Sequence, residues 1–215
     1  MERKRAAPPL CSGVFQMTTF PKVAAVFAVF AFAGALPAAA EPFSIGLWGY
    51  MPYAKANDAP AIPALLADIN ASGIAFSIYD GYIKDGSSQC TDDIYVDAAA
   101  MFNSLSAPVI YEPGDNEWTD CHRKNNGGYD NLERLTHLRK TMFDTVETFG
   151  QRKLTVEHQG APGEAYAENV LHSQGGAMFV GLNVPGSNNN MVTSDANCTK
   201  KSARTLAQCA ADNAE

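Results

Sequence analysis

Apolar residues along the chain fall into two alternating patterns. Short apolar runs rich in β-forming residues are each followed by a loop, and they predict buried strands at residues 42–50, 74–79 and 107–114. In the other pattern apolar residues recur every three or four positions, which predicts helices at residues 61–70, 94–105 and 132–142. The order strand, helix, strand, helix, strand favours a parallel sheet covered by helices, so we expect an α/β fold.

Polar residues mark where two of these helices should begin. Thr91 is the predicted N-cap of the second helix, with Asp92 and Asp93 in its first turn. Asp130 lies near the start of the third helix. Such residues stabilise a helix start because they accept hydrogen bonds from its free N–H groups.

The last third of the chain predicts a hairpin and a helix. Residues 169–173 and 177–184 flank Gly175 and Gly176, which predicts a β-hairpin. Residues 202–213 predict a final helix.

Ligands of parallel sheets bind at the carboxyl ends of the strands. The loops that follow the three predicted strands cover residues 48–53, 79–90 and 112–123. The third loop is the most polar stretch of the chain. We therefore expect a functional site where these three loops meet.

The first 40 residues have the features of an export signal. Lys22 is followed by an apolar run over residues 23–36 and by an Ala-x-Ala site, which predicts cleavage after Ala40. The alternative is a membrane anchor, but the run is shorter than the ~20 apolar residues that a spanning helix needs. We expect a periplasmic or secreted domain over residues 41–215 with no membrane anchor after cleavage. Met17 is an alternative start of translation.

The predicted mature chain is acidic. The full sequence has 16 Lys and Arg and 23 Asp and Glu. Removing the leader leaves 12 and 22, a net charge of −10. Such a surface repels nucleic acid and anionic lipid, so we expect neither as a partner, and it is compatible with binding cations.

Four cysteines remain after the leader is removed, and an even number in an exported protein indicates disulfides. Four cysteines allow three pairings. We favour Cys90 with Cys121, because both follow predicted strand ends, and Cys198 with Cys209, because they are close in sequence. A zinc site is the alternative, although the chain has no Cys-x-x-Cys pair.

The strand-end loops and the segments after them resemble the calcineurin-like metallophosphoesterases, in particular an exported bacterial branch. The resemblance covers most of the mature chain, and its most specific part is PGDNEWTDCHR followed by GGYDNLERL. The matching segments are residues 48–53, 79–90, 113–123, 127–140, 165–170 and 184–190.

The resemblance implies a sandwich of two sheets flanked by helices. Members of the superfamily continue into a further half-sheet with a His-x-His pair, which this sequence lacks. We expect a partly complete sandwich, either truncated at its C-terminal side or completed in another way.

The resemblance also implies a pair of divalent cations, Mn, Fe or Zn, about 3.5–4 Å apart, that activate water to attack a small-molecule phosphoester. Matched by position, Asp115 stands for an asparagine ligand and Asn116 for the histidine that contacts phosphate or the leaving group. Asn183 stands where some relatives have a histidine ligand. Tyr50 and Tyr82 stand where two metal-binding aspartates are expected, the second of them bridging.

Tyrosine changes this chemistry. A phenol has a pKa of ~10, against ~4 for aspartate, so at neutral pH it offers an uncharged oxygen. Asp80 is a substitute ligand only if the chain stays extended up to Tyr82, and a phenolate on ferric iron is a further alternative. Each tyrosine taken alone reads as aromatic packing at a strand end.

We therefore expect an exported metallophosphoesterase-like protein that holds no metal and is a weak or inactive hydrolase. The alternatives are a non-catalytic periplasmic binding protein that uses the acidic cleft and a truncated product without a stable fold. Asp115, Glu117 and Asp120 read equally well as a solvated acidic loop.

Overall fold

The computed structural model describes residues 41–53, 60–195, 198 and 203–214. The predicted signal peptide, with Met17 and Ala40, lies outside the described residues. Three parallel strands form the first sheet, in the order β1-β2-β3: β1 (Ile45–Trp48), β2 (Phe76–Asp80) and β3 (Val109–Glu112). All three predicted strands are confirmed, each somewhat shorter than expected.

A second sheet is antiparallel, in the order β4-β5-β6. Its strands are β4 (Glu157–His158), β5 (Val170–Gln174) and β6 (Ala177–Gly181). The predicted hairpin is confirmed, because β5 and β6 pair from Gln174 and Ala177 outward. Its turn is Gly175-Gly176, and both glycines have the positive φ that such a turn requires.

The structure has the helices α1 (Ala61–Ala71), α2 (Asp93–Asn103), α3 (Asn131–Met142), the one-turn α4 (Gly186–Asn189) and α6 (Leu206–Asp212), with a 3-10 turn η1 (Lys124–Asn126). The helices α1, α2 and α3 lie where the apolar spacing of the sequence predicts them, and α6 lies within the predicted final helix.

Two helix starts differ in how well they were predicted. Asp130 caps α3 as expected, because its carboxylate accepts a hydrogen bond from the Glu133 N–H. The prediction for Thr91 was wrong: Asp92 is the cap residue of α2 and makes no side-chain cap bond. Its carboxylate instead accepts a 2.7 Å hydrogen bond from Arg134 of α3, which ties the two helices together.

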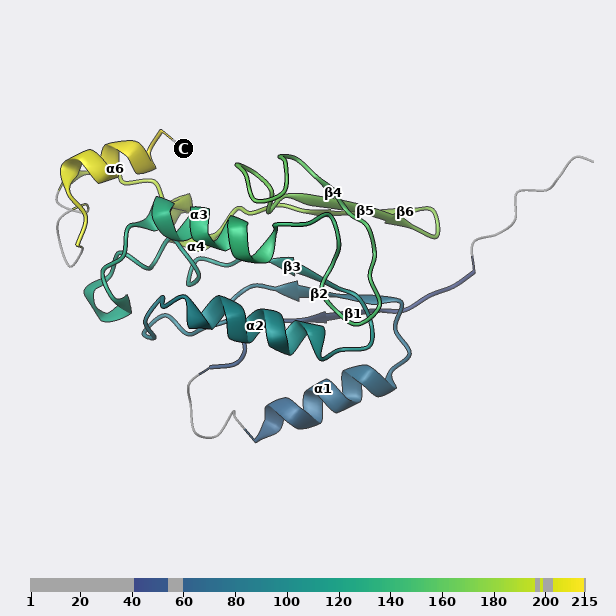
Figure 1. Cartoon of the computed structure of the whole chain (residues 1–215). Helices are drawn as coiled ribbons and strands as arrows, with labels where there is room; N and C mark the ends of the chain where they lie inside the picture. The colour runs from purple at the N-terminus through teal and green to yellow at the C-terminus, as the bar shows by residue number, and fades with distance from the viewer. Residues whose placement is uncertain (1–40, 54–59, 196–197, 199–202, 215) are drawn as a thin grey trace, which may run out of the picture. The chain divides into compact units, whose positions relative to one another are not determined.

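The parallel sheet has a different neighbour on each face. On one face Tyr79 packs against Phe102 of α2, with ring centroids 4.7 Å apart. On the other face Phe76 packs against Phe179 of β6 at 5.0 Å. The fold is therefore a mixed α/β arrangement in which a parallel sheet lies between α2 and an antiparallel sheet (Figure 1).

Both sheets have an edge strand with exposed apolar side chains. In the parallel sheet Leu47 of β1 is 71% exposed, and in the antiparallel sheet Val180 of β6 is 55% exposed. Open edges with apolar residues are uncommon because they invite pairing with another chain. Within the described residues, no helix has both the length and the apolar character needed to cross a bilayer.

Candidate functional site

Two tyrosines meet at the carboxyl ends of β1 and β2. The rings of Tyr50 and Tyr82 are stacked, with centroids 4.3 Å apart and planes 14° from parallel. The Tyr50 N–H also donates to the Gly81 carbonyl at 3.0 Å, so the two loops are joined through the backbone. Both tyrosines have a left-handed backbone, with φ of 63° and 69°.

Tyr82 lies against the third strand-end loop. A Cβ atom at Gly114, the residue before Asp115, would lie 3.0 Å from Cδ2 of the Tyr82 ring. Burial raises the pKa of Tyr82 well above its usual range, and the negative charge of Asp115 raises it further. The Tyr82 phenol is therefore neutral and adds no negative charge to the site.

The loop after β6 covers Asp115 from another side. Ser187 Oγ lies 2.6 Å from Asp120 Oδ1 and 3.2 Å from Asp115 Oδ2, so its single hydrogen can be donated to either carboxylate. A Cβ atom at Gly186 would lie 2.5 Å from Asp115 Oδ2, so a side chain there would displace the Asp115 carboxylate. The site thus joins Asp115 to segments that follow β2 and β6.

Asn116 links the second and third loops. Its Nδ2 donates to the Lys84 carbonyl at 3.0 Å, and Lys84 Nζ donates to the Asn116 carbonyl at 3.0 Å. Both side chains are buried. In this structure the Asn116 amide nitrogen holds a loop, so its predicted role as a phosphate contact stays a prediction.

The reading of this region as a solvated acidic loop was wrong for two of its three residues. Glu117 is fully buried and Asp120 is 2% exposed. Glu117 Oε1 accepts a 2.7 Å hydrogen bond from the Ile83 N–H, and burial raises the pKa of Glu117 to about 7. These carboxylates were not recognised from the sequence because nothing in an acidic loop signals burial.

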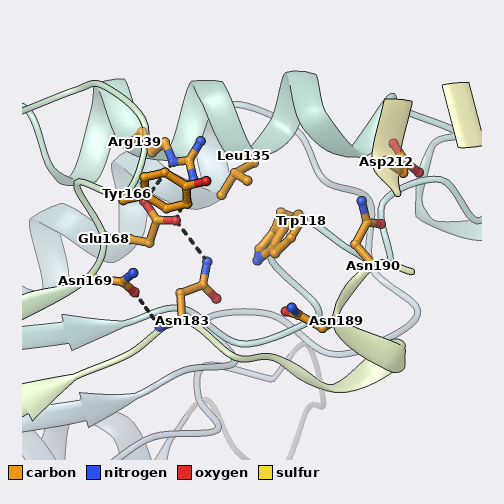
Figure 2. Close-up of a pocket in the computed structure, with 10 residues that line it drawn as sticks. All are labelled: Trp118, Leu135, Arg139, Tyr166, Glu168, Asn169, Asn183, Asn189, Asn190 and Asp212. Carbon is orange, nitrogen blue, oxygen red and sulfur yellow. Dashed lines mark hydrogen bonds and ion pairs between the residues drawn. The ribbon is translucent and has the colours of Figure 1, made fainter. Parts of the chain in front are cut away.

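The other two predicted ligands lie apart from Tyr82. Gly81 and Tyr82 both have positive φ, so the chain turns after β2. The extended segment that would aim Asp80 as a substitute ligand is therefore absent, and Asp80 is exposed. Asn183 contacts Glu168 and Asn169 on the wall of a separate pocket (Figure 2).

All four mature cysteines form the predicted disulfides. Cys90 pairs with Cys121, with Cα atoms 5.7 Å apart, and Cys198 pairs with Cys209 at 6.1 Å. The first bond joins the loop after β2 to the loop after β3. The zinc alternative for these thiols does not apply, and the disulfides are compatible with a periplasmic or extracellular protein.

The residues at the strand ends do not fit a pair of divalent cations. A bridging ligand must present an anionic oxygen, whereas Tyr82 presents a neutral hydroxyl because burial and the Asp115 charge raise its pKa. Across the described ranges, no three His, Cys, Asp or Glu side chains are grouped as metal ligands. What the site offers instead is a stacked aromatic pair beside a carboxylate.

No family model, no curated protein and no solved structure matches the chain. The function of the chain is therefore inferred from the geometry of the strand-end loops.

Proposed function

We propose that this chain is an exported protein of the metallophosphoesterase type that hydrolyses phosphoesters weakly or not at all. The observation that carries the proposal is the stacked pair of Tyr50 and Tyr82 at the ends of two neighbouring strands. Where the resemblance expects a bridging carboxylate, the neutral phenol of Tyr82 lies near Asp115, the ligand position that survives. A metal pair there would lack the negative charge that holds it.

The backbone supports the idea that the tyrosines replaced aspartates. Asp and Asn adopt the left-handed conformation much more readily than bulky residues do. Tyr50 and Tyr82 both have this conformation. The backbone at these two positions therefore suits the residue that the resemblance expects better than the residue that is present.

The architecture is also compatible with the proposal. The sheets pack face to face with helices around them, and the three strand-end loops converge. The exposed apolar side chains on β1 and β6 are in keeping with a sandwich that is only partly complete.

A non-catalytic binding protein is the second candidate. It is favoured by the stacked ring of Tyr50, which is 56% exposed and offers a flat aromatic surface at the ligand-binding edge of the sheet. On this reading the tyrosines are a gain of binding surface rather than a loss of metal ligands.

Restoring the two carboxylates tests the first proposal. Tyr50→Asp/Tyr82→Asp is compared with Tyr50→Asn/Tyr82→Asn, which has the same shape and no added charge. The metal content of each protein is measured by elemental analysis after exposure to Mn²⁺, and hydrolysis is measured with bis(4-nitrophenyl) phosphate.

We expect the aspartate variant to retain Mn²⁺ and to hydrolyse the diester at least about tenfold faster than the asparagine variant and the native chain. Equal activity in the two variants, with both folded, would argue for the binding protein. Tight binding of two ions with rapid turnover by the native chain would contradict the proposal directly.

A further inference from the structure

A pocket of about 120 Å³ lies beside α3, away from the stacked tyrosines. None of its lining residues is Tyr50, Tyr82 or Asp115. It is lined by residues from five separate segments of the chain, among them Trp118, Arg139, Tyr166, Glu168 and Asn183 (Figure 2). The volume exceeds that needed for a single water molecule.

Four polar atoms of the residues that line the pocket have no hydrogen-bond partner among the described residues. Two are Asn190 Nδ2 and Asp212 Oδ1, and the other two are the indole Nε1 of Trp118 and the amide Oδ1 of Asn183. The Trp118 side chain is 5% exposed, and Figure 2 shows its nitrogen directed into the pocket on the side of Asn183. Buried polar atoms without partners cost free energy, so a ligand that satisfies Trp118 Nε1 and Asn183 Oδ1 is favoured.

The Trp118 and Asn183 atoms require opposite partners. The indole N–H is only a donor and the amide oxygen is only an acceptor. A hydroxyl group can accept from the first and donate to the second. The unsatisfied pair therefore selects for hydroxyl-bearing molecules.

Each charged side chain that lines the pocket is paired with an opposite charge, Asp212 with Arg204 and Arg139 with Glu168. Arg139 donates from Nε and Nη2 to the two carboxylate oxygens of Glu168, both at 2.7 Å. Both side chains are buried. This closed pair offers little attraction to either an anion or a cation, so an uncharged ligand fits best.

The mouth of the pocket is aromatic and amide-rich. Tyr166 is 43% exposed, and the amides of Asn169 and Asn189 also line the pocket. Tyr166 and Asn189 both have positive φ, so two strained segments hold these side chains at the opening. A ring and several amides give a sugar-like molecule one apolar contact and several polar ones.

We propose that this pocket binds a small neutral polyhydroxylated molecule, such as a monosaccharide or a cyclitol, through Trp118 Nε1 and Asn183 Oδ1. This assignment gives Asn183 a role in a second site instead of in a metal centre. The proposal does not depend on the role of Tyr50 and Tyr82.

Tryptophan fluorescence tests the proposal. The chain has two tryptophans, so Trp48→Phe leaves Trp118 as the single reporter. This variant is titrated with D-glucose, myo-inositol and glycerol, and with glucose 6-phosphate as a charged comparison. The same titrations are made after adding Asn183→Ala, with Asn125→Ala as an exposed control outside the pocket.

We expect a saturable change in Trp118 emission with glucose or myo-inositol and weaker binding of glucose 6-phosphate. Asn183→Ala should weaken binding about tenfold, the effect of losing one hydrogen bond, and Asn125→Ala should not. Trp118→Phe keeps a ring and removes only the donor, so calorimetry on this variant should show a similar loss.

Two outcomes would overturn the proposal. One is a folded protein with no saturable change up to about 0.1 M of any neutral polyol, which would mean that the pocket holds water only. The other is binding that is unchanged in both Asn183→Ala and Trp118→Phe. Neither outcome bears on the metal and hydrolysis test, because that test changes residues outside this pocket.

Discussion

Tyr82 lies close enough to Asp115 for the negative charge of this carboxylate to raise the pKa of the phenol. Replacing the phenol with a carboxylate would place two negative charges near each other, which is unfavourable unless a cation lies between them. We predict that in chelator Tyr82→Asp unfolds with a free energy at least about 1 kcal/mol below that of Tyr82→Asn.

Adding Mn²⁺ should raise the free energy of unfolding of Tyr82→Asp to that of Tyr82→Asn or above it. The stability of the native chain should not change. Thermal unfolding with and without Mn²⁺ provides the measurement. The asparagine variant has the same left-handed preference as aspartate, so the comparison isolates charge. An identical response of both variants to Mn²⁺ would contradict this reading of the site.

Arg139 and Glu168 form a buried ion pair with two hydrogen bonds. Removing one partner leaves the other charge buried without compensation. We predict that Arg139→Met lowers the free energy of unfolding by about 3–5 kcal/mol. The double variant Arg139→Met/Glu168→Leu should lose less, because no unpaired charge remains. Urea denaturation measures the free energy of unfolding of both variants. A double variant less stable than Arg139→Met would show that the unpaired Glu168 charge does not cause the loss.

Alanine substitutions at Gly81 and Gly73 separate backbone strain from steric clash. Both have positive φ, so alanine is strained by a similar amount at each, about 1–2 kcal/mol. A Cβ atom at Gly81 would also lie 2.8 Å from the Gly114 backbone nitrogen, while at Gly73 it would meet nothing within 4 Å.

We therefore predict that Gly81→Ala destabilises the fold clearly more than Gly73→Ala in urea unfolding. The excess measures how tightly the loops after β2 and β3 approach. Equal losses would mean that these loops move apart without cost.

Glu112 should make stability depend on pH. Burial raises its pKa from 4.5 to about 8, helped by the charges of Asp80 and Glu168. The folded state therefore keeps the proton of Glu112 up to a higher pH than the unfolded state does. The stability contributed by this group is complete below pH 4.5 and is lost as the pH rises through about 8.

We predict that Glu112→Gln, which is neutral at every pH, gains stability relative to the native chain as the pH is raised from 5 to 9. The expected gain is a few kcal/mol at most. Denaturation curves at several pH values provide the test. A constant difference between the two proteins across that range would exclude Glu112 as the source.

The sequence predicted the scaffold better than the site. The β-rich runs around Phe76 and Val109 could only be buried strands, and helical spacing located α1, α2 and α3. Asp130 was found as a cap because capping is local. Thr91 was predicted as the cap of α2 and Asp92 was not. The contact that Asp92 makes, with Arg134, comes from a helix about 40 residues away and has no local signal.

The site was harder to predict because it depends on contacts between loops. The sequence placed Tyr50, Tyr82 and Asp115 at three strand ends, which meet as expected. It did not reveal the ring stacking or the left-handed backbone. The burial of Glu117 depends on loop packing that no local pattern encodes.

The pocket beside α3 had no sequence signal at all. Trp118, Arg139 and Asn183 lie in different segments, and only the packing of those segments brings them together. An isolated Asn or Trp in a polar loop is compatible with many roles.

The bond between Cys90 and Cys121 has a consequence for how the protein must be produced. It ties the segment that carries Tyr82 to the segment that carries Asp115. In a reducing cytoplasm that tie would stay open, so the two halves of the strand-end site would be held only by weaker contacts. The arrangement described here is thus a property of the oxidised chain, and samples made without thiol oxidation would contain a different molecule.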